Sequence, residues 1–82
     1  MSLEAFIKST FDAMKSMIEE REKELHNFGN TLSNDRVNAL TRECEAAREM
    51  INEHGSLWGS DRASELHRRN DSCLQKLKSL KN

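Results

Sequence analysis

The sequence predicts an all-α fold, an antiparallel, left-handed, up-down-up bundle of three helices. The 82 residues contain no proline, three glycines divide them into long stretches, and apolar residues within each stretch recur at alternating steps of three and four. Such heptad spacing gives each helix one apolar face and is typical of left-handed helical packing. A chain of this length fits one small domain, so residues 1–82 are expected to form a single bundle.

The first predicted helix spans about residues 3–28. Its inward face has seven heptad positions, one of them an arginine: Ile7, Phe11, Met14, Ile18, Arg21, Leu25 and Phe28. Gly29 follows the last of these positions. We expect it to end the helix, because glycine adopts the left-handed conformation that often closes a helix.

The second and third predicted helices span about residues 34–55 and 60–81. Residues of the types that cap helix N-termini lie at both starts, Ser33 to Asp35 before Val37 and Ser60 with Asp61 before Ala63. Gly55 is expected to end the second helix. The inward positions are Val37, Leu40, Cys44, Ala47, Ile51, His54 and Trp58, then Ala63, Leu66, Asn70, Cys73, Leu77 and Leu80.

Short connections make successive helices antiparallel, and one register then stacks all three heptads in layers. In this register Arg21 faces Cys44 and Cys73, while Asn70 faces Ile18 and Ala47. The agreement among three helices favours a closed bundle over a helical hairpin or an extended coiled coil.

The first two helices resemble a spectrin repeat. The run Met17-Ile18-Glu19-Glu20-Arg21-Glu22 is similar to the Trp-Ile-Glu-Glu-Lys-Glu stretch of that family's first helix, with Met17 in place of the tryptophan. Val37, Leu40 and Glu45 are similar to the V-x-x-L-x-x-x-H-E start of its second helix, with Cys44 in place of the histidine. The resemblance implies a non-enzymatic spacer or protein-interaction module of a larger cytoskeletal or scaffold protein in the cytoplasm, with tandem neighbouring repeats.

A different class of function is also compatible with the bundle. It is a helical docking or regulatory domain of a multisubunit assembly, such as the N-terminal bundle of a membrane-trafficking protein. The heptad pattern runs to Leu80 without a glycine or proline to stop it, which predicts that the third helix continues into a longer protein. Tandem copies of the pattern would favour the spacer, and a lone copy would favour the docking domain.

The sequence predicts no enzyme, metal or cofactor. Cys44 and His54 lie ten residues apart on one helix, about 15 Å along its axis, so they cannot form a nucleophile–base pair. The chain has no Glu-x-x-His, Cys-x-x-Cys or glycine-rich phosphate motif. Two alternatives remain for Cys44 and Cys73, and buried free thiols are favoured over a disulfide because helix axes usually lie too far apart for a bridge.

Charge is distributed unevenly along the chain. Residues 62–82 carry six Lys and Arg against two Asp and Glu, whereas residues 1–61 carry seven against twelve. We expect the basic segment to lie against acidic neighbours rather than to bind nucleic acid, because a phosphate-binding surface needs uncompensated positive charge. The neighbours expected are Glu19, Glu20, Glu43 and Glu49. No apolar run exceeds two residues, so no membrane-inserted segment is predicted.

Several inward or turn residues are candidates for special roles. The polar heptad residues Arg21, His54 and Asn70 are interpreted as setting the register of the bundle. Three methionines, Met14, Met17 and Met50, are interpreted as core residues, the alternative being an adaptable groove. Leu57 and Trp58 are placed in a turn between two glycines, where they are candidate contacts for a protein partner. For Trp58, closing the end of the bundle against Ile7 is favoured.

Overall fold

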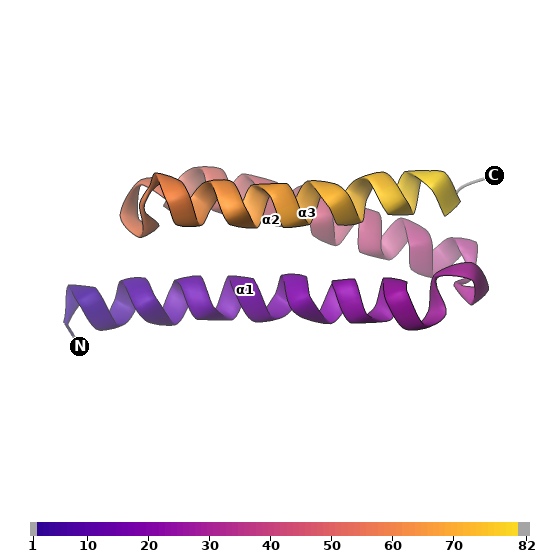
Figure 1. Ribbon diagram of the computed structural model, residues 1–82, viewed down its shortest axis with the longest axis horizontal. Coiled ribbons are helices and arrows are strands. Elements are labelled where there is room, and N and C mark those ends of the chain that lie inside the picture. The colour runs from indigo at the N-terminus through magenta and orange to yellow at the C-terminus, as the bar shows by residue number, and fades with distance from the viewer. Residues whose placement is uncertain (1, 81–82) are drawn as a thin grey trace.

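A computed structural model describes residues 2–80, which are almost entirely helical (Figure 1). Helix α1 spans Leu3–Phe28, α2 spans Asn34–Trp58 and α3 spans Ser60–Leu80. A short 3-10 helix, Gly29–Thr31, joins α1 to α2. The bundle measures 45 × 18 × 17 Å. The end predicted for the third helix, Lys81, lies outside the described residues.

Side-chain contacts show that the helices run up, down and up. The start of α1 meets the end of α2 through Thr10 and Trp58, and the end of α1 meets the start of α2 through Glu24 and Arg36. Asn52 and His67 pair α2 with α3 in the same antiparallel sense. The predicted all-α, three-helix architecture is therefore confirmed.

Serine caps fix two of the helix starts. The Oγ atom of Ser2 accepts a hydrogen bond from the amide of Ala5 at 3.1 Å, and Oγ of Ser33 accepts one from the amide of Arg36 at 3.2 Å. Each cap satisfies an amide that has no partner within its own helix. The predicted start of the second helix at residue 34 is confirmed.

The two glycines predicted to end helices differ in outcome. Helix α1 ends at Phe28 with Gly29 as its C-cap, as predicted, but Gly29 has φ −47°, so the left-handed conformation expected there is wrong and Gly29 begins the 3-10 helix. Gly55 lies inside α2, which continues for one more turn and ends at Gly59, with φ +100°. A methyl group added at Gly55 would lie 3.1 Å from the Cβ atom of Ala63, so its missing side chain serves close packing of α2 on α3. Leu57 and Trp58 therefore belong to the last turn of α2.

The core follows the predicted heptads through most of its length. The buried apolar side chains are Met14, Ile18, Leu25, Val37, Leu40, Cys44, Ala47, Ile51, Trp58, Leu66, Cys73, Leu74 and Leu77. Phe28 is wrongly predicted to be among them, since it is 57% exposed. Leu32, which follows the 3-10 helix, packs against this end of the core instead.

Helix α1 is not equally close to α2 along its length. The two helices meet at the end that carries the 3-10 helix and separate toward the start of α1 (Figure 1). Trp58, the only tryptophan, lies at this wider end and packs with Phe11, and Ile7 packs against the same core cluster. The bulk of Trp58 fills the space that the divergence creates.

Candidate functional site

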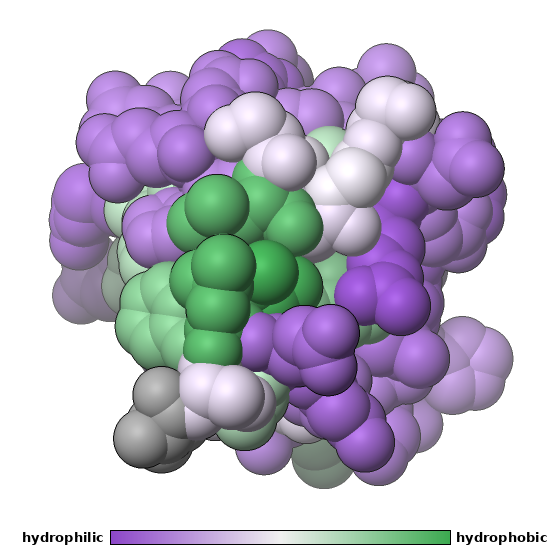
Figure 2. Space-filling view, turned by 90° about the vertical axis from the view of Figure 1, so that its left-hand side faces the viewer, coloured by the Kyte–Doolittle hydropathy of each residue, from purple (hydrophilic) through white to green (hydrophobic). Residues whose placement is uncertain are grey.

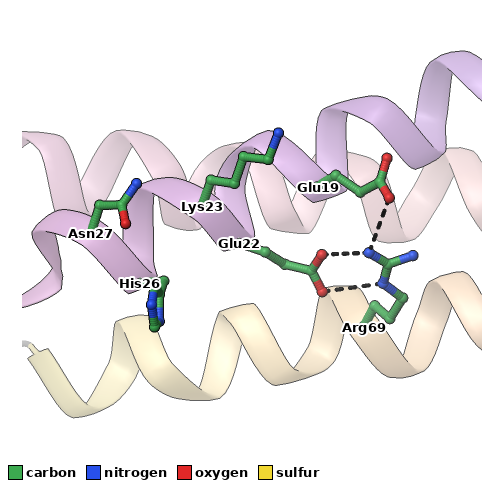
Figure 3. A pocket seen from close by; sticks show the side chains of 6 residues that line it. All are labelled: Glu19, Glu22, Lys23, His26, Asn27 and Arg69. Atoms are coloured by element: carbon green, nitrogen blue, oxygen red, sulfur yellow. Dashed lines mark hydrogen bonds and ion pairs between the residues drawn. The ribbon is translucent and has the colours of Figure 1, made fainter.

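A surface hollow lined by charged and polar residues lies between α1 and α3 (Figure 3). Arg69 reaches across it from α3, and both oxygens of Glu22 accept hydrogen bonds from its guanidinium. Glu19 adds a longer ion pair at 3.6 Å. Hydrogen bonding to Glu22 raises the pKa of Arg69 further, so the arginine stays charged. This cluster attaches α3 to α1, and its carboxylates are already paired.

These ion pairs test the prediction that the basic third helix faces acidic neighbours. Glu19 is one of the predicted partners, but Glu22 was missed. Glu43 pairs with arginines of α1 and α2, not with α3. Within residues 2–80, Glu20 and Glu49 form no ion pair. The third helix therefore does pair with acidic residues of α1, as predicted, but of the four acidic partners named only Glu19 is correct.

A second hollow is apolar and lies between α1 and α2. We call it the Met17–Met50 groove; its lining residues are Thr10, Ala13, Met14, Met17, Met50, His54 and Trp58. The side chains of Met17 and Met50 are 47% and 45% exposed, so their assignment to the core is wrong. Met14 is buried beneath them and is correctly assigned. The two exposed thioethers form flexible, apolar walls of a groove open to solvent.

Trp58 forms the floor of this groove at the wider end. Its indole Nε1 donates a hydrogen bond to Oγ1 of Thr10 at 3.1 Å, and its ring meets that of Phe11 edge to face at 5.8 Å. With 6% of its surface exposed, the ring does not project as a partner anchor. It closes the end of the bundle, as the favoured alternative predicts.

His54 lies at the edge of the groove and not inside the core, so its placement as a core register residue is wrong. Its ring stacks on Trp58 at 5.7 Å, and Nδ1 lies 3.0 Å from the carbonyl oxygen of Met50. The last turn of α2 faces the diverging part of α1, where the core no longer encloses this position. His54 therefore covers one face of the indole and leaves its own outer face to solvent.

Exposed apolar residues extend from the groove onto the end of the bundle. Leu3, Phe6 and Leu57 are 66%, 43% and 44% exposed. Figure 2 shows the apolar residues gathered in one patch on this end, where α1 begins and α2 turns into α3. Of the two predicted partner contacts, Leu57 remains available at the surface.

The two remaining polar heptad residues are buried in the middle of the bundle. Asn70 is fully buried and its Nδ2 donates a hydrogen bond to the carbonyl oxygen of Cys44 at 2.8 Å. Arg21 is 4% exposed; its Nη1 lies 3.4 Å from Glu43, while Nε and Nη2 have no partner. Arg21 is thus buried, as its heptad position predicts, and its guanidinium is enclosed between the helices.

Cys44 and Cys73 are buried free thiols. Burial raises the pKa of both, that of Cys73 to about 11. A thiol with a raised pKa is protonated near neutral pH and is therefore a poor nucleophile. Within residues 2–80, no group of three His, Cys, Asp or Glu side chains could hold a metal ion.

No family model, no curated protein and no solved structure matches the chain. The resemblance to a spectrin repeat therefore rests only on the sequence similarities described above. The three-helix bundle rests on the structure itself. In the described part of the chain, no helix is both long and apolar enough to cross a membrane.

The groove corresponds to the alternative that the sequence analysis considered for the methionines but did not favour. A second row of α1 residues, Phe6, Thr10, Ala13 and Met17, has spacing 4-3-4, and Met50, His54 and Leu57 have spacing 4-3 on α2. These rows lie beside the core heptads and carry the exposed apolar side chains. Searching each helix for two heptad rows would have indicated this surface.

Proposed function

We propose that this chain is a non-enzymatic protein-interaction module whose Met17–Met50 groove receives a helix of a partner protein. The observation that carries the proposal is the groove itself, since two large apolar side chains stand nearly half exposed above a buried tryptophan. The apolar rows beside it have heptad spacing, which suits knobs-into-holes packing by one more helix. The partner would complete a four-helix arrangement on the open side of α1 and α2.

The chemistry of the groove supports binding of a helix more than catalysis. Its lining is mostly aliphatic, sulfur-containing and aromatic, and His54 is its only ionisable side chain. Flexible methionines are common on protein surfaces that adapt to apolar partner residues. The two free thiols would fit a reducing compartment such as the cytoplasm.

A spacer like a spectrin repeat is the second candidate. The arrangement of three antiparallel helices supports it, because the start of α1 and the end of α3 lie at opposite ends of the 45 Å axis (Figure 1). A spacer needs a rigid length but has no use for an open groove. The two candidates therefore differ in what a groove substitution does.

Site-specific photocrosslinking in the source cells tests the proposed function. A photoreactive residue at Met50 should yield a covalent adduct with a defined protein, whereas the same residue at the exposed Glu45 should not. The identified partner, once purified, should bind the chain and lose at least about tenfold in affinity with Met50→Glu, since a charge in an apolar contact is costly. Unchanged melting of this exposed variant excludes unfolding as the cause.

An adduct that forms equally at both positions would contradict the proposal. So would a purified partner that binds Met50→Glu as tightly as the unaltered chain. Either result would favour the spacer.

A further inference from the structure

We propose that the helix received by the Met17–Met50 groove is basic, with an apolar stripe flanked by lysine or arginine residues. The inference rests on the proposed function and adds the chemical class of the partner. It is carried by the charges that border the groove.

Two carboxylates lie next to the groove methionines on the surfaces of α1 and α2. Glu20 lies three residues after Met17, and Glu53 lies three residues after Met50, so each neighbours a groove methionine on the helix surface. Both are exposed, and neither forms an ion pair within residues 2–80. They are therefore free to pair with cations of a partner helix.

The apolar rows also continue into carboxylates. Glu24 follows Met17 by seven residues and Glu43 precedes Met50 by seven, so each occupies the same row one heptad away. Arg36 pairs with Glu24 at 2.7 Å and with Glu43 at 3.8 Å. Hydrogen bonding to Arg36 lowers the pKa of Glu24, which keeps this carboxylate ionised.

Arginines compensate only the carboxylates one heptad away from the methionines. Arg36 pairs with Glu24 and Glu43, and the buried Arg21 lies 3.4 Å from Glu43. Glu20 and Glu53 have no such partner within residues 2–80, and the exposed Arg42 lies eight residues before Met50, about 12 Å along the axis. Across the chain, α1 and α2 carry eleven Asp and Glu against seven Lys and Arg, whereas α3 carries three against five. The groove is thus formed by the two acidic helices.

The bundle already contains one pairing of this kind. The basic helix α3 packs on α1, and Arg69 bridges Glu19 and Glu22 (Figure 3). A basic partner helix would repeat the pairing on the opposite side of α1. A second copy of the chain would instead bring two acidic borders together, and an anionic lipid surface would be repelled for the same reason.

A fluorescence titration tests the inference, because Trp58 is the only tryptophan and forms the floor of the groove. Three synthetic helical peptides would be used. Two share one leucine heptad and carry either lysine or glutamate at the flanking positions, and the third is a scrambled form of the lysine peptide. The lysine peptide should change the Trp58 emission and bind at least about tenfold more tightly than the others, with an affinity that falls as salt rises.

Charge reversal at the border provides the matched comparison. The double variant Glu20→Lys, Glu53→Lys should bind the lysine peptide about fivefold or more weakly, given the usual energy of exposed ion pairs. It should bind the glutamate peptide more tightly than the unaltered chain does. Asp12→Lys with Glu45→Lys makes the same change in net charge away from the groove. Its effect should stay within about twofold.

Equal binding of the lysine and glutamate peptides would overturn the inference, as would equal effects of the two charge reversals. Two further results would overturn the inference by indicating another occupant of the groove. Sedimentation showing a dimer with Trp58 protected would indicate a second copy of the chain, and binding to phosphatidylserine vesicles would indicate a lipid surface. If photocrosslinking at Met50 identifies a partner while the lysine peptide fails to bind, the proposed function stands and the basic partner does not.

Discussion

Trp58→Ala should destabilise the bundle by about 3–5 kcal/mol, the range typical of removing a large buried aromatic side chain. The indole joins α1 to α2 through its hydrogen bond to Thr10 and its edge-to-face contact with Phe11. It also fills the space where these helices diverge. Urea unfolding followed by circular dichroism measures the change without relying on tryptophan emission.

The loss of stability in Trp58→Ala should be concentrated in α1. Hydrogen exchange of Trp58→Ala should speed up most in the first half of α1, because this segment has lost its main contact with α2. Trp58→Phe is the control, since it keeps an aromatic ring and loses the indole N–H; we expect a cost of about 1 kcal/mol. Equal stability of the alanine and phenylalanine variants would show that the ring contributes little to packing.

Leu40→Ala should cost about 2–5 kcal/mol, because the side chain is buried at the other end of the bundle and its removal leaves a cavity. For a domain of this size the melting temperature should fall by at least about 10 °C. The transition should remain a single cooperative step, because the helices share one core. The control Lys15→Ala, at an exposed position of α1, should stay within about 0.5 kcal/mol.

If Leu40→Ala lowered the free energy of unfolding no more than Lys15→Ala does, the second helix would not pack as described. Melting in two separate steps would show that α1 is not part of the same cooperative unit. Both outcomes would contradict the described fold. Binding at the groove is tested separately by the peptide and crosslinking experiments.

The core could be predicted from the sequence because a heptad specifies which helix face is buried. Ile18, Leu40, Ile51, Leu66 and Leu77 lie at heptad positions and are fully or almost fully buried. The helix ends were harder to predict. Gly55 looks like a terminator in the sequence, but its role is to let α3 approach, and that approach depends on where Ala63 lies in space.

The groove could not be predicted from the core pattern alone. Exposure of Met17 and Met50 depends on the angle between α1 and α2, and one heptad per helix does not specify that angle. The same divergence leaves His54 at the surface while the indole of Trp58 remains covered. Arg21 is buried as its heptad position predicts, but the sequence does not show that its guanidinium would reach only Glu43.

The central claim is that the Met17–Met50 groove is the binding surface, and a methyl spectrum of the chain labelled with carbon-13 at its methionine methyl groups tests it most directly. Adding the lysine peptide should shift the resonances of Met17 and Met50, which line the groove and are exposed. The resonance of the buried Met14 should move less. A peptide that binds while the Met17 and Met50 resonances stay in place would contradict the account, because the occupied surface would then lie elsewhere on the bundle.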